Sequence, residues 1–204
     1  MIKLEKDDGL WIVTIARPDK ANSLTEAMLT QLAEIAESAT QARALILTGE
    51  GKVFSAGADL DEARAGLAVS PVWERLSGAI AALPGLTIAA LNGTLAGGAM
   101  GMALACDIRL GVAGAKFFYP VMKLGFLPQP SDPARMASLI GPARAKLILM
   151  GGQKILADEA LSFGLIDRIV DTDVVQAARE ICTDTLAAKP EIARGIKDMC
   201  AGAT

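Results

Sequence analysis

Short apolar runs alternate along this chain with stretches in which apolar residues recur at helical spacing. The runs over residues 10–15, 44–48 and 86–91 are rich in aliphatic residues and end at turn-forming residues. We therefore predict a strand at each of them. Two further strands are predicted over residues 107–112 and 165–170.

Helices are predicted in the intervals between the strands. Ser23 and Glu26 have the spacing of a capping box and predict a helix start. A second helix is predicted over residues 97–105. Asp132 and Pro133 suit the N-cap and first position of a third helix. Later helices are predicted over residues 143–150, 157–163, 174–188 and 190–200.

The alternation of strands and helices continues without a linker or a low-complexity segment. This pattern predicts an α/β fold in one domain spanning residues 1–204, a length that suffices for a sizeable core. Strand order does not follow from periodicity.

Composition narrows the classes of partner. The net charge is −3 and no basic stripe is present, so we expect no nucleic-acid partner. Residues 76–106 carry no charge, but Pro, Gly and Asn interrupt them, so we expect no membrane span.

The first ten residues lack the apolar core of a signal peptide, and the three cysteines form no CxxC pair. These features predict a cytoplasmic protein with reduced thiols.

Histidine is absent from the sequence. Its absence excludes Ser-His and Cys-His nucleophile systems and histidine-ligated zinc or iron, and we predict no metal site.

Two glycine-containing segments, residues 54–60 and 92–99, are the candidates for chemistry. Small residues let a ligand approach the backbone, and a helix N-terminus leaves amide N–H groups unpaired. One amide from each segment would make an oxyanion hole. The alternative is structural, because Gly97 and Gly101 are also spaced for close packing of a helix.

The order and spacing of several segments resemble the enoyl-CoA hydratase/isomerase (crotonase) family. The segments are RPDKANSL at 17–24, LTGEGKVFSAGADL at 47–60, the Asn-Gly and Gly-Gly pairs of 92–98, and ACDIR at 105–109. The resemblance continues through residues 115–128, 141, 151, 157–160 and 164–166. It covers nearly the whole chain.

The resemblance implies a crotonase-type spiral of ββα units over residues 1–170, followed by a shortened helical C-terminal region at 171–204. It implies an acyl-CoA substrate, in which coenzyme A is part of the substrate and no other cofactor is needed. It also implies a homotrimer or hexamer, and the apolar residues 97–112 suggest more surface than one domain hides. The short C-terminal region leaves two alternatives: an open site, or cover from a neighbouring subunit.

Carried over residue by residue, the resemblance implies that the backbone amides of Ala58 and Gly98 form the oxyanion hole. The residues expected along the acyl-CoA site are Lys20, Ala21, Ser23, Ala56, Asp59, Leu60, Gly97, Gly101, Pro120, Val121 and Leu124.

This sequence departs from the family where hydratases carry two catalytic glutamates, because Gly101 and Val121 stand at those positions. Hydration needs a general acid and a general base, and neither residue transfers protons. The sequence therefore favours enolate chemistry that needs no glutamate, such as decarboxylation of a malonyl-type thioester. The alternative is a non-catalytic acyl-CoA-binding or structural homologue.

Six polar side chains are candidate replacements, each with a structural alternative. Tyr119 is interpreted as a core phenol, Asp132 as a helix cap, and Gln129 and Ser131 as loop residues or pocket polar groups. Asp61 and Glu62 belong to a solvated helix face or to the pocket mouth. Cys106 is expected to be buried and inert.

Overall fold

The computed structural model describes residues 1–200. These residues form ten strands: β1 (Ile2–Asp7), β2 (Leu10–Ile15), β3 (Ala44–Gly49), β4 (Val53–Ser55), β5 (Leu86–Leu91), β6 (Thr94–Ala96), β7 (Ile108–Val112), β8 (Lys116–Phe118), β9 (Ile155–Leu156) and β10 (Arg168–Val170). They also form ten α-helices: α1 (Glu26–Ser38), α2 (Leu60–Arg64), α3 (Val72–Ala81), α4 (Met100–Leu104), α5 (Val121–Leu124), α6 (Asp132–Ile140), α7 (Pro142–Leu149), α8 (Ala157–Phe163), α9 (Val174–Ala187) and α10 (Pro190–Cys200).

Six strands form the main sheet, in the order β1-β2-β3-β5-β7-β10. Strand β1 pairs with β2 in antiparallel fashion, and the other neighbours are parallel. The central strand β3 is buried along almost its whole length, as expected for a parallel strand covered on both faces. Its Ile46 lies between Ile12 and Ile88 in the register.

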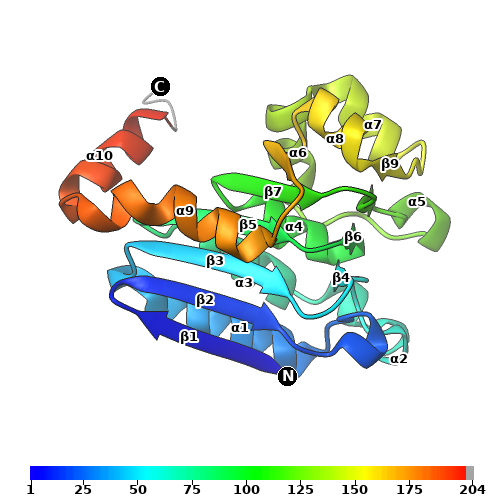
Figure 1. Ribbon diagram of the computed structural model, residues 1–204. Helices are drawn as coiled ribbons and strands as arrows, with labels where there is room; N and C mark the ends of the chain where they lie inside the picture. Colours follow the sequence, from blue (N-terminus) through cyan, green and yellow to red (C-terminus); the bar gives the residue numbers. More distant parts are fainter. Residues whose placement is uncertain (201–204) are drawn as a thin grey trace.

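Helices cover both faces of this sheet (Figure 1). Leu45 and Leu47 of β3 share a core with α1, α3 and α4, whereas Ala44 and Ile46 share a second core with α9. The side chains of a strand point alternately to its two faces. The near-continuous apolar run of β3 is therefore explained by two separate layers of helix.

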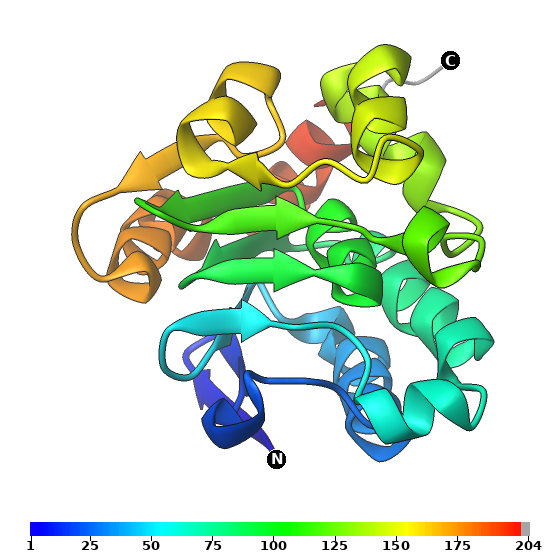
Figure 2. The same ribbon diagram turned by 90° about the vertical axis from the view of Figure 1, so that its right-hand side faces the viewer.

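The second sheet has the order β4-β6-β8-β9. Its strands β4, β6 and β8 each follow a main-sheet strand directly in the chain, and a helix follows each pair (Figure 2). The repeated strand–strand–helix unit confirms the expected ββα spiral.

Two predicted helix starts are wrong. The N-cap of α1 is Thr25, whose hydroxyl accepts a hydrogen bond from the Met28 amide, and not Ser23. Asp132 is the first residue of α6 and does not cap it, because its side chain turns into the protein. The helix predicted over 97–105 begins with a 3₁₀ turn at Gly97–Ala99 and becomes α-helical at Met100.

The surface argument for an oligomer is also wrong, because every residue of α4 is buried within the chain itself. Exposed apolar side chains lie elsewhere, on α5 and the loop after it and on α10: Met122, Leu124, Phe126, Leu127, Ile192, Ile196 and Met199. Within residues 1–200, no helix is long and apolar enough to cross a membrane.

Candidate active site

The two glycine-containing segments meet, backbone against backbone, where β4 and β6 end. These strands pair in parallel, so their carboxyl ends lie at one edge of the second sheet. Gly57 and Gly97 both have positive φ, +91° and +59°, which favours glycine. A Cβ on Gly57 would lie 2.9 Å from the Ala96 carbonyl oxygen and 3.4 Å from Gly97 Cα. Glycine therefore permits both the turn and the close approach.

This geometry leaves two amides available. Leu24 forms an isolated parallel β-bridge with Ala58. The bonds of this bridge are made by the two neighbours of Ala58: the Leu24 amide donates to Gly57 O, and the Asp59 amide donates to Leu24 O, both at 2.8 Å. In such a bridge the N–H of the middle residue, Ala58, points away from Leu24. Among the turn, loop and side-chain hydrogen bonds of residues 1–200, neither Ala58 N–H nor Gly98 N–H is a donor.

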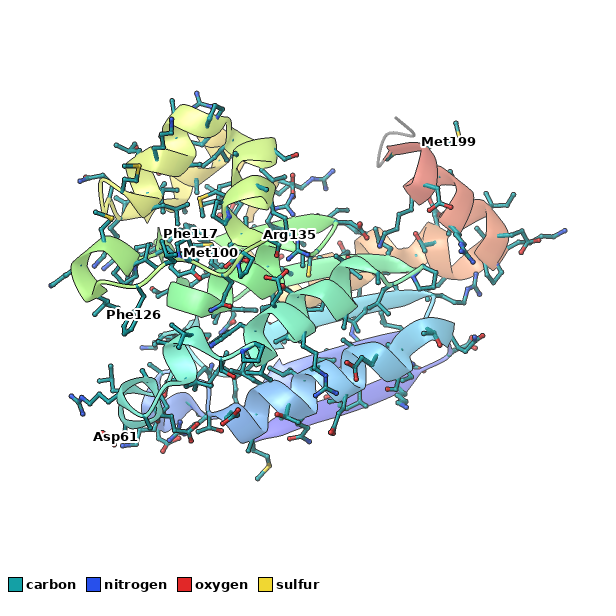
Figure 3. The ribbon with its side chains drawn as sticks, turned by 180° about the vertical axis from the view of Figure 1, so that it is seen from behind. Asp61, Met100, Phe117, Phe126, Arg135 and Met199 are labelled. Carbon is teal, nitrogen blue, oxygen red and sulfur yellow. The ribbon has the colours of Figure 1, made fainter. Side chains whose placement is uncertain are left out.

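Both residues line a cavity of about 560 Å³ between α2 and α5. Its walls are Ala56, Ala58, Leu60, Ala63, Arg64, Ala68, Trp73, Ala96, Gly97, Gly98, Phe118, Tyr119, Pro120, Val121, Lys123, Leu124, Phe126, Leu127 and Gln129. Figure 3 shows Asp61 of α2 and Phe126 at this end of the molecule, and Met199 of α10 at the opposite end. Arg64 and Lys123 are the charged residues of the lining.

Most of the residues expected at the site line this cavity. They are Ala56, Ala58, Leu60, Gly97, Gly98, Pro120, Val121 and Leu124. The remaining five are absent from its lining: Lys20, Ala21, Ser23, Asp59 and Gly101.

Asp59 has a structural task that explains its place outside the lining. Its carboxylate accepts a hydrogen bond from Arg17 at 2.8 Å and another from the Asp61 amide, which caps α2. The Arg17 hydrogen bond lowers the pKa of Asp59. Arg17 also donates to Ser23. The predicted residues Lys20, Ala21 and Ser23 thus belong to a loop that Arg17 links to Asp59, the N-cap of α2.

Gly101 faces a buried carboxyl instead of the cavity. Asp132 is fully buried, and its Oδ2 accepts a hydrogen bond from the Tyr119 hydroxyl at 3.0 Å. A Cβ on Gly101 would lie 2.6 Å from Asp132 Oδ1. Burial raises the pKa of Asp132 to about 6, and burial together with the Asp132 charge raises the pKa of Tyr119. The absence of a side chain at position 101 thus makes room for the carboxyl of residue 132.

Gln129 and Ser131 differ in their placement. Gln129 lines the cavity, its side-chain amide donates to Ala68 O at 3.2 Å, and its backbone amide donates to the Tyr119 hydroxyl at 3.4 Å. Ser131 does not line the cavity, and its amide donates to Glu74 at 3.3 Å. Of these two residues, only Gln129 lines the cavity.

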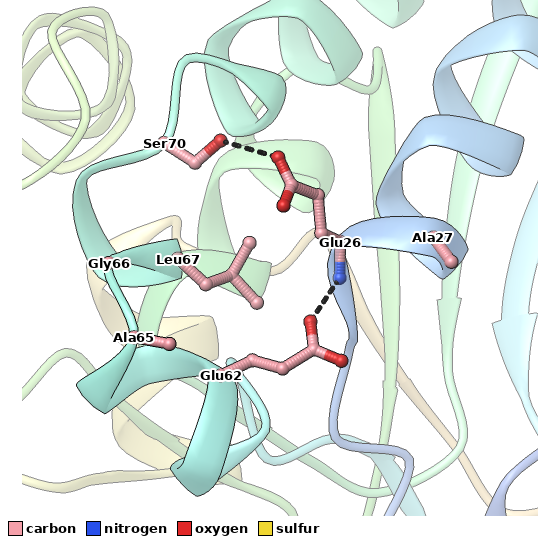
Figure 4. Close-up of a pocket in the computed structure, with 7 residues that line it drawn as sticks. All are labelled: Glu26, Ala27, Glu62, Ala65, Gly66, Leu67 and Ser70. Atoms are coloured by element: carbon pink, nitrogen blue, oxygen red, sulfur yellow. Dashed lines mark hydrogen bonds between the residues drawn. The ribbon is translucent and has the colours of Figure 1, made fainter.

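Glu62 lies in a different hollow, of about 500 Å³, between the start of α1 and the segment after α2 (Figure 4). Its Oε2 accepts a hydrogen bond from the Glu26 amide at 2.6 Å, at the positive end of α1. Asp61 is exposed and pairs with Arg64. Neither Asp61 nor Glu62 lines the cavity.

Cys106 is buried, as expected. Burial raises the pKa of its thiol to about 12, so the reactive thiolate does not form near neutral pH.

Trp73 and the loop residues Phe126 and Leu127 are cavity residues that sequence reasoning missed. A Cβ on Gly98 would lie 3.2 Å from the Trp73 ring, so this indole forms the wall beside the Gly98 amide. The presence of tryptophan in a weakly aromatic chain was a usable signal. No sequence spacing, however, links α3 to residue 98.

Comparison with known proteins gives consistent results. A family described as enoyl-CoA hydratase/isomerase matches residues 5–203. The chain is 33% identical to the short-chain-enoyl-CoA hydratase of Clostridium acetobutylicum over 92% of this chain and 76% of that protein. It is 28% identical to the ethylmalonyl-CoA decarboxylase of Bos taurus over 96% of this chain and 69% of that protein. The structure of Pseudomonas aeruginosa DspI superimposes with a TM-score of 0.90 at 31% identity, covering 99% of this chain and 86% of that one. The structure of the enoyl-CoA hydratase of Bacillus anthracis superimposes with a TM-score of 0.89 at 31% identity, covering 98% of this chain and 82% of that one.

Proposed function

Because the chain belongs to the enoyl-CoA hydratase/isomerase family, we propose that its cavity binds an acyl-CoA thioester and stabilises the enolate of that thioester. The observation that carries this proposal is the convergence of the Ala58 and Gly98 segments on one apolar cavity. Arg64 and Lys123 in the lining provide positive charge for the phosphates of coenzyme A.

The two amides act on the thioester oxygen. When the thioester becomes an enolate, negative charge develops on this oxygen, and preorganised N–H donors stabilise it more than they stabilise the neutral carbonyl. Each such donor contributes about 3 kcal/mol to transition-state stabilisation in comparable sites. Apolar walls such as Trp73 and Phe118 keep water away and strengthen this interaction.

The reaction class that fits these side chains best is decarboxylation of a malonyl-type thioester. Gly101 and Val121 supply no general base, and decarboxylation needs none to reach the enolate. The bond between Cα and the carboxylate breaks, carbon dioxide leaves, and the electron pair forms the enolate. One of the similar proteins carries the name ethylmalonyl-CoA decarboxylase, which supports this choice.

A second candidate is an acyl-CoA-binding protein without catalysis, which is favoured by the same two replacements, Gly101 and Val121. Calorimetry with acetyl-CoA and free coenzyme A tests the binding that both candidates share. We expect saturable heat, together with a raised melting temperature at millimolar ligand. Absence of both effects would reject acyl-CoA binding itself.

Turnover separates the two candidates. The native protein is incubated with malonyl-, methylmalonyl-, ethylmalonyl- and crotonyl-CoA, and the products are identified by mass spectrometry. We expect carbon dioxide loss from at least one malonyl-type thioester and no useful hydration of crotonyl-CoA, since the hydratase carboxylates are missing. Binding without any turnover would favour the non-catalytic alternative. Robust hydration would show that other groups transfer protons.

A further inference from the structure

A buried carboxyl lies behind the wall of the cavity, and the enolate chemistry described above does not use it. Asp132 is fully buried, and its Oδ1 has no hydrogen-bond partner within residues 1–200. An unpartnered buried carboxyl oxygen costs free energy and is rare in folded proteins. Its second oxygen accepts a hydrogen bond from the Tyr119 hydroxyl at 3.0 Å.

Tyr119 connects this carboxyl to the cavity. The tyrosine lines the cavity, while its hydroxyl bonds to Asp132 and accepts a hydrogen bond from the Gln129 amide at 3.4 Å. It directly follows β8, in which Phe118 pairs with Ala96, the residue before the Gly97-Gly98 turn. The sheet therefore brings Tyr119 alongside the segment that supplies one of the proposed oxyanion donors.

Resting on the proposed enolate chemistry, we propose that Tyr119 protonates the α-carbon of the enolate and that Asp132 positions and reprotonates Tyr119. The enolate double bond supplies the electron pair for the new C–H bond, and the negative charge leaves the oxygen as the thioester carbonyl re-forms. The phenolate then takes the proton of the Asp132 carboxyl. Solvent water restores that proton, so the overall reaction consumes one proton for each carbon dioxide released.

The protonation state of Asp132 determines the direction of the tyrosine hydroxyl. A protonated Asp132 donates to the phenol oxygen and leaves the Tyr119 proton free to face the cavity, whereas an ionised Asp132 accepts that proton. Burial raises the pKa of Asp132 to about 6, the Tyr119 hydrogen bond and the Arg135 charge lower it, and the Glu74 charge raises it. We therefore expect kcat to fall as the pH rises through about 6.

The first test is Tyr119→Phe, which removes only the hydroxyl. We expect kcat for a malonyl-type thioester to fall by about 100-fold or more, the usual contribution of a general acid. The dissociation constant for acetyl-CoA, measured by calorimetry, should change little, because the apolar wall remains. A kcat within about threefold of the native value would overturn the proposed proton donor.

The second test is Asp132→Asn, with Asp167→Asn as the matched control. The side-chain amide that Asp132→Asn introduces can donate to the phenol oxygen at every pH, so the decline of kcat near pH 6 should disappear. Asp167 pairs with Arg109 outside the cavity lining, and its amide variant should keep the native pH profile. A purely structural role for Asp132 would lower kcat and leave the shape of the profile unchanged, which would also overturn the proposal.

Failure of the underlying function gives a different result. If the native protein turns over no malonyl-type thioester, the proposed enolate chemistry is rejected, and the proposed proton donor is rejected with it. If the native protein is active and Tyr119→Phe does not fold, as judged by thermal melting, the pH profiles of the native protein and Asp132→Asn decide the question. A native kcat that does not decline between pH 5 and 7 would then overturn it.

Discussion

Gly101 and Asp132 share one small volume. Asp132 Oδ1 lies 2.6 Å, and its Cγ 3.2 Å, from the point that a Cβ on residue 101 would occupy. A side chain at one position therefore requires the other to move, and a glutamate at position 101 is incompatible with Asp132 in its observed place. The sequence left close packing as one role for Gly101, and the group that packs against it is the carboxyl of Asp132.

The first prediction tests this coupling through protein stability. Gly101→Ala should lower the free energy of unfolding by about 1–3 kcal/mol, the usual cost of overpacking a core. In the Asp132→Ala background the same change should cost clearly less, because the clashing oxygens are gone. Urea unfolding of the native protein, both single variants and the double variant measures this coupling. Additive effects would show that the two residues do not compete for space.

The second prediction concerns stability and pH. Folding raises the pKa of Asp132 to about 6, so its protonation stabilises the folded state. This contribution is fully present below the unfolded-state pKa of about 4 and is lost as the pH rises through about 6. Between pH 4 and 7 the native protein should lose of order 2 kcal/mol relative to Asp132→Asn. Urea unfolding of both proteins at several pH values tests this; parallel curves would contradict it.

Local signals explain which parts of the site the sequence could predict. Ala58 and Gly98 stand in motifs whose small residues are needed for a close backbone approach, so the sequence points to them directly. Asp132 could not be placed in the same way. An aspartate before proline at a helix start is typical of a cap, and only the absence of a side chain at Gly101, 31 positions earlier, lets its carboxyl turn inward.

At the scale of elements, apolar periodicity located the long strands β2, β3 and β5, because each buries side chains on both faces. It missed β4, β6 and β8, since a strand of three residues shows no repeat. It also missed β1, an edge strand with only Ile2 buried, whose register is set by the tight turn at Asp8 and Gly9. The second sheet and its pairing thus depend on tertiary contacts.

The third prediction distinguishes the observed cap of α1 from the one that the sequence suggested. Thr25→Ala removes the hydroxyl that accepts from the Met28 amide and should cost about 1 kcal/mol of stability. Ser23→Ala removes a hydroxyl whose hydrogen bond to Arg17 is long, at 3.3 Å, and should cost less. Thermal or urea unfolding compares the two. A larger loss of unfolding free energy for Ser23→Ala than for Thr25→Ala would instead support Ser23 as the cap, as the sequence predicted.

At the scale of the whole molecule, exposed apolar side chains within residues 1–200 include those of two segments far apart in the chain. The loop after α5 exposes Phe126 and Leu127, and α10 exposes Ile192, Ile196 and Met199, which are spaced along one side of the helix. These surfaces lie at opposite ends of the molecule (Figure 3). Side chains of this kind commonly become buried when protomers associate.

The fourth prediction is therefore a trimer or hexamer, as the family resemblance implies. Multi-angle light scattering at micromolar concentration should give three or six times the 21.1-kDa protomer mass. Ile192→Glu combined with Ile196→Glu tests whether α10 contributes to the interface, with Leu161→Glu, another exposed apolar residue, as the control. A monomeric native protein would reject the predicted assembly.

In both sheets of residues 1–200, neighbouring strands stand in the order in which they occur in the chain. No strand has to enter between two that are already paired, so each new strand can add to a growing edge. The chain can accordingly begin to fold from its N-terminus while the ribosome is still adding its later strands. Because β2, β3, β5 and β7 have a neighbour on each side and β1 and β10 have one on only one side, amide hydrogen exchange should be slower in the four interior strands than in the two edge strands.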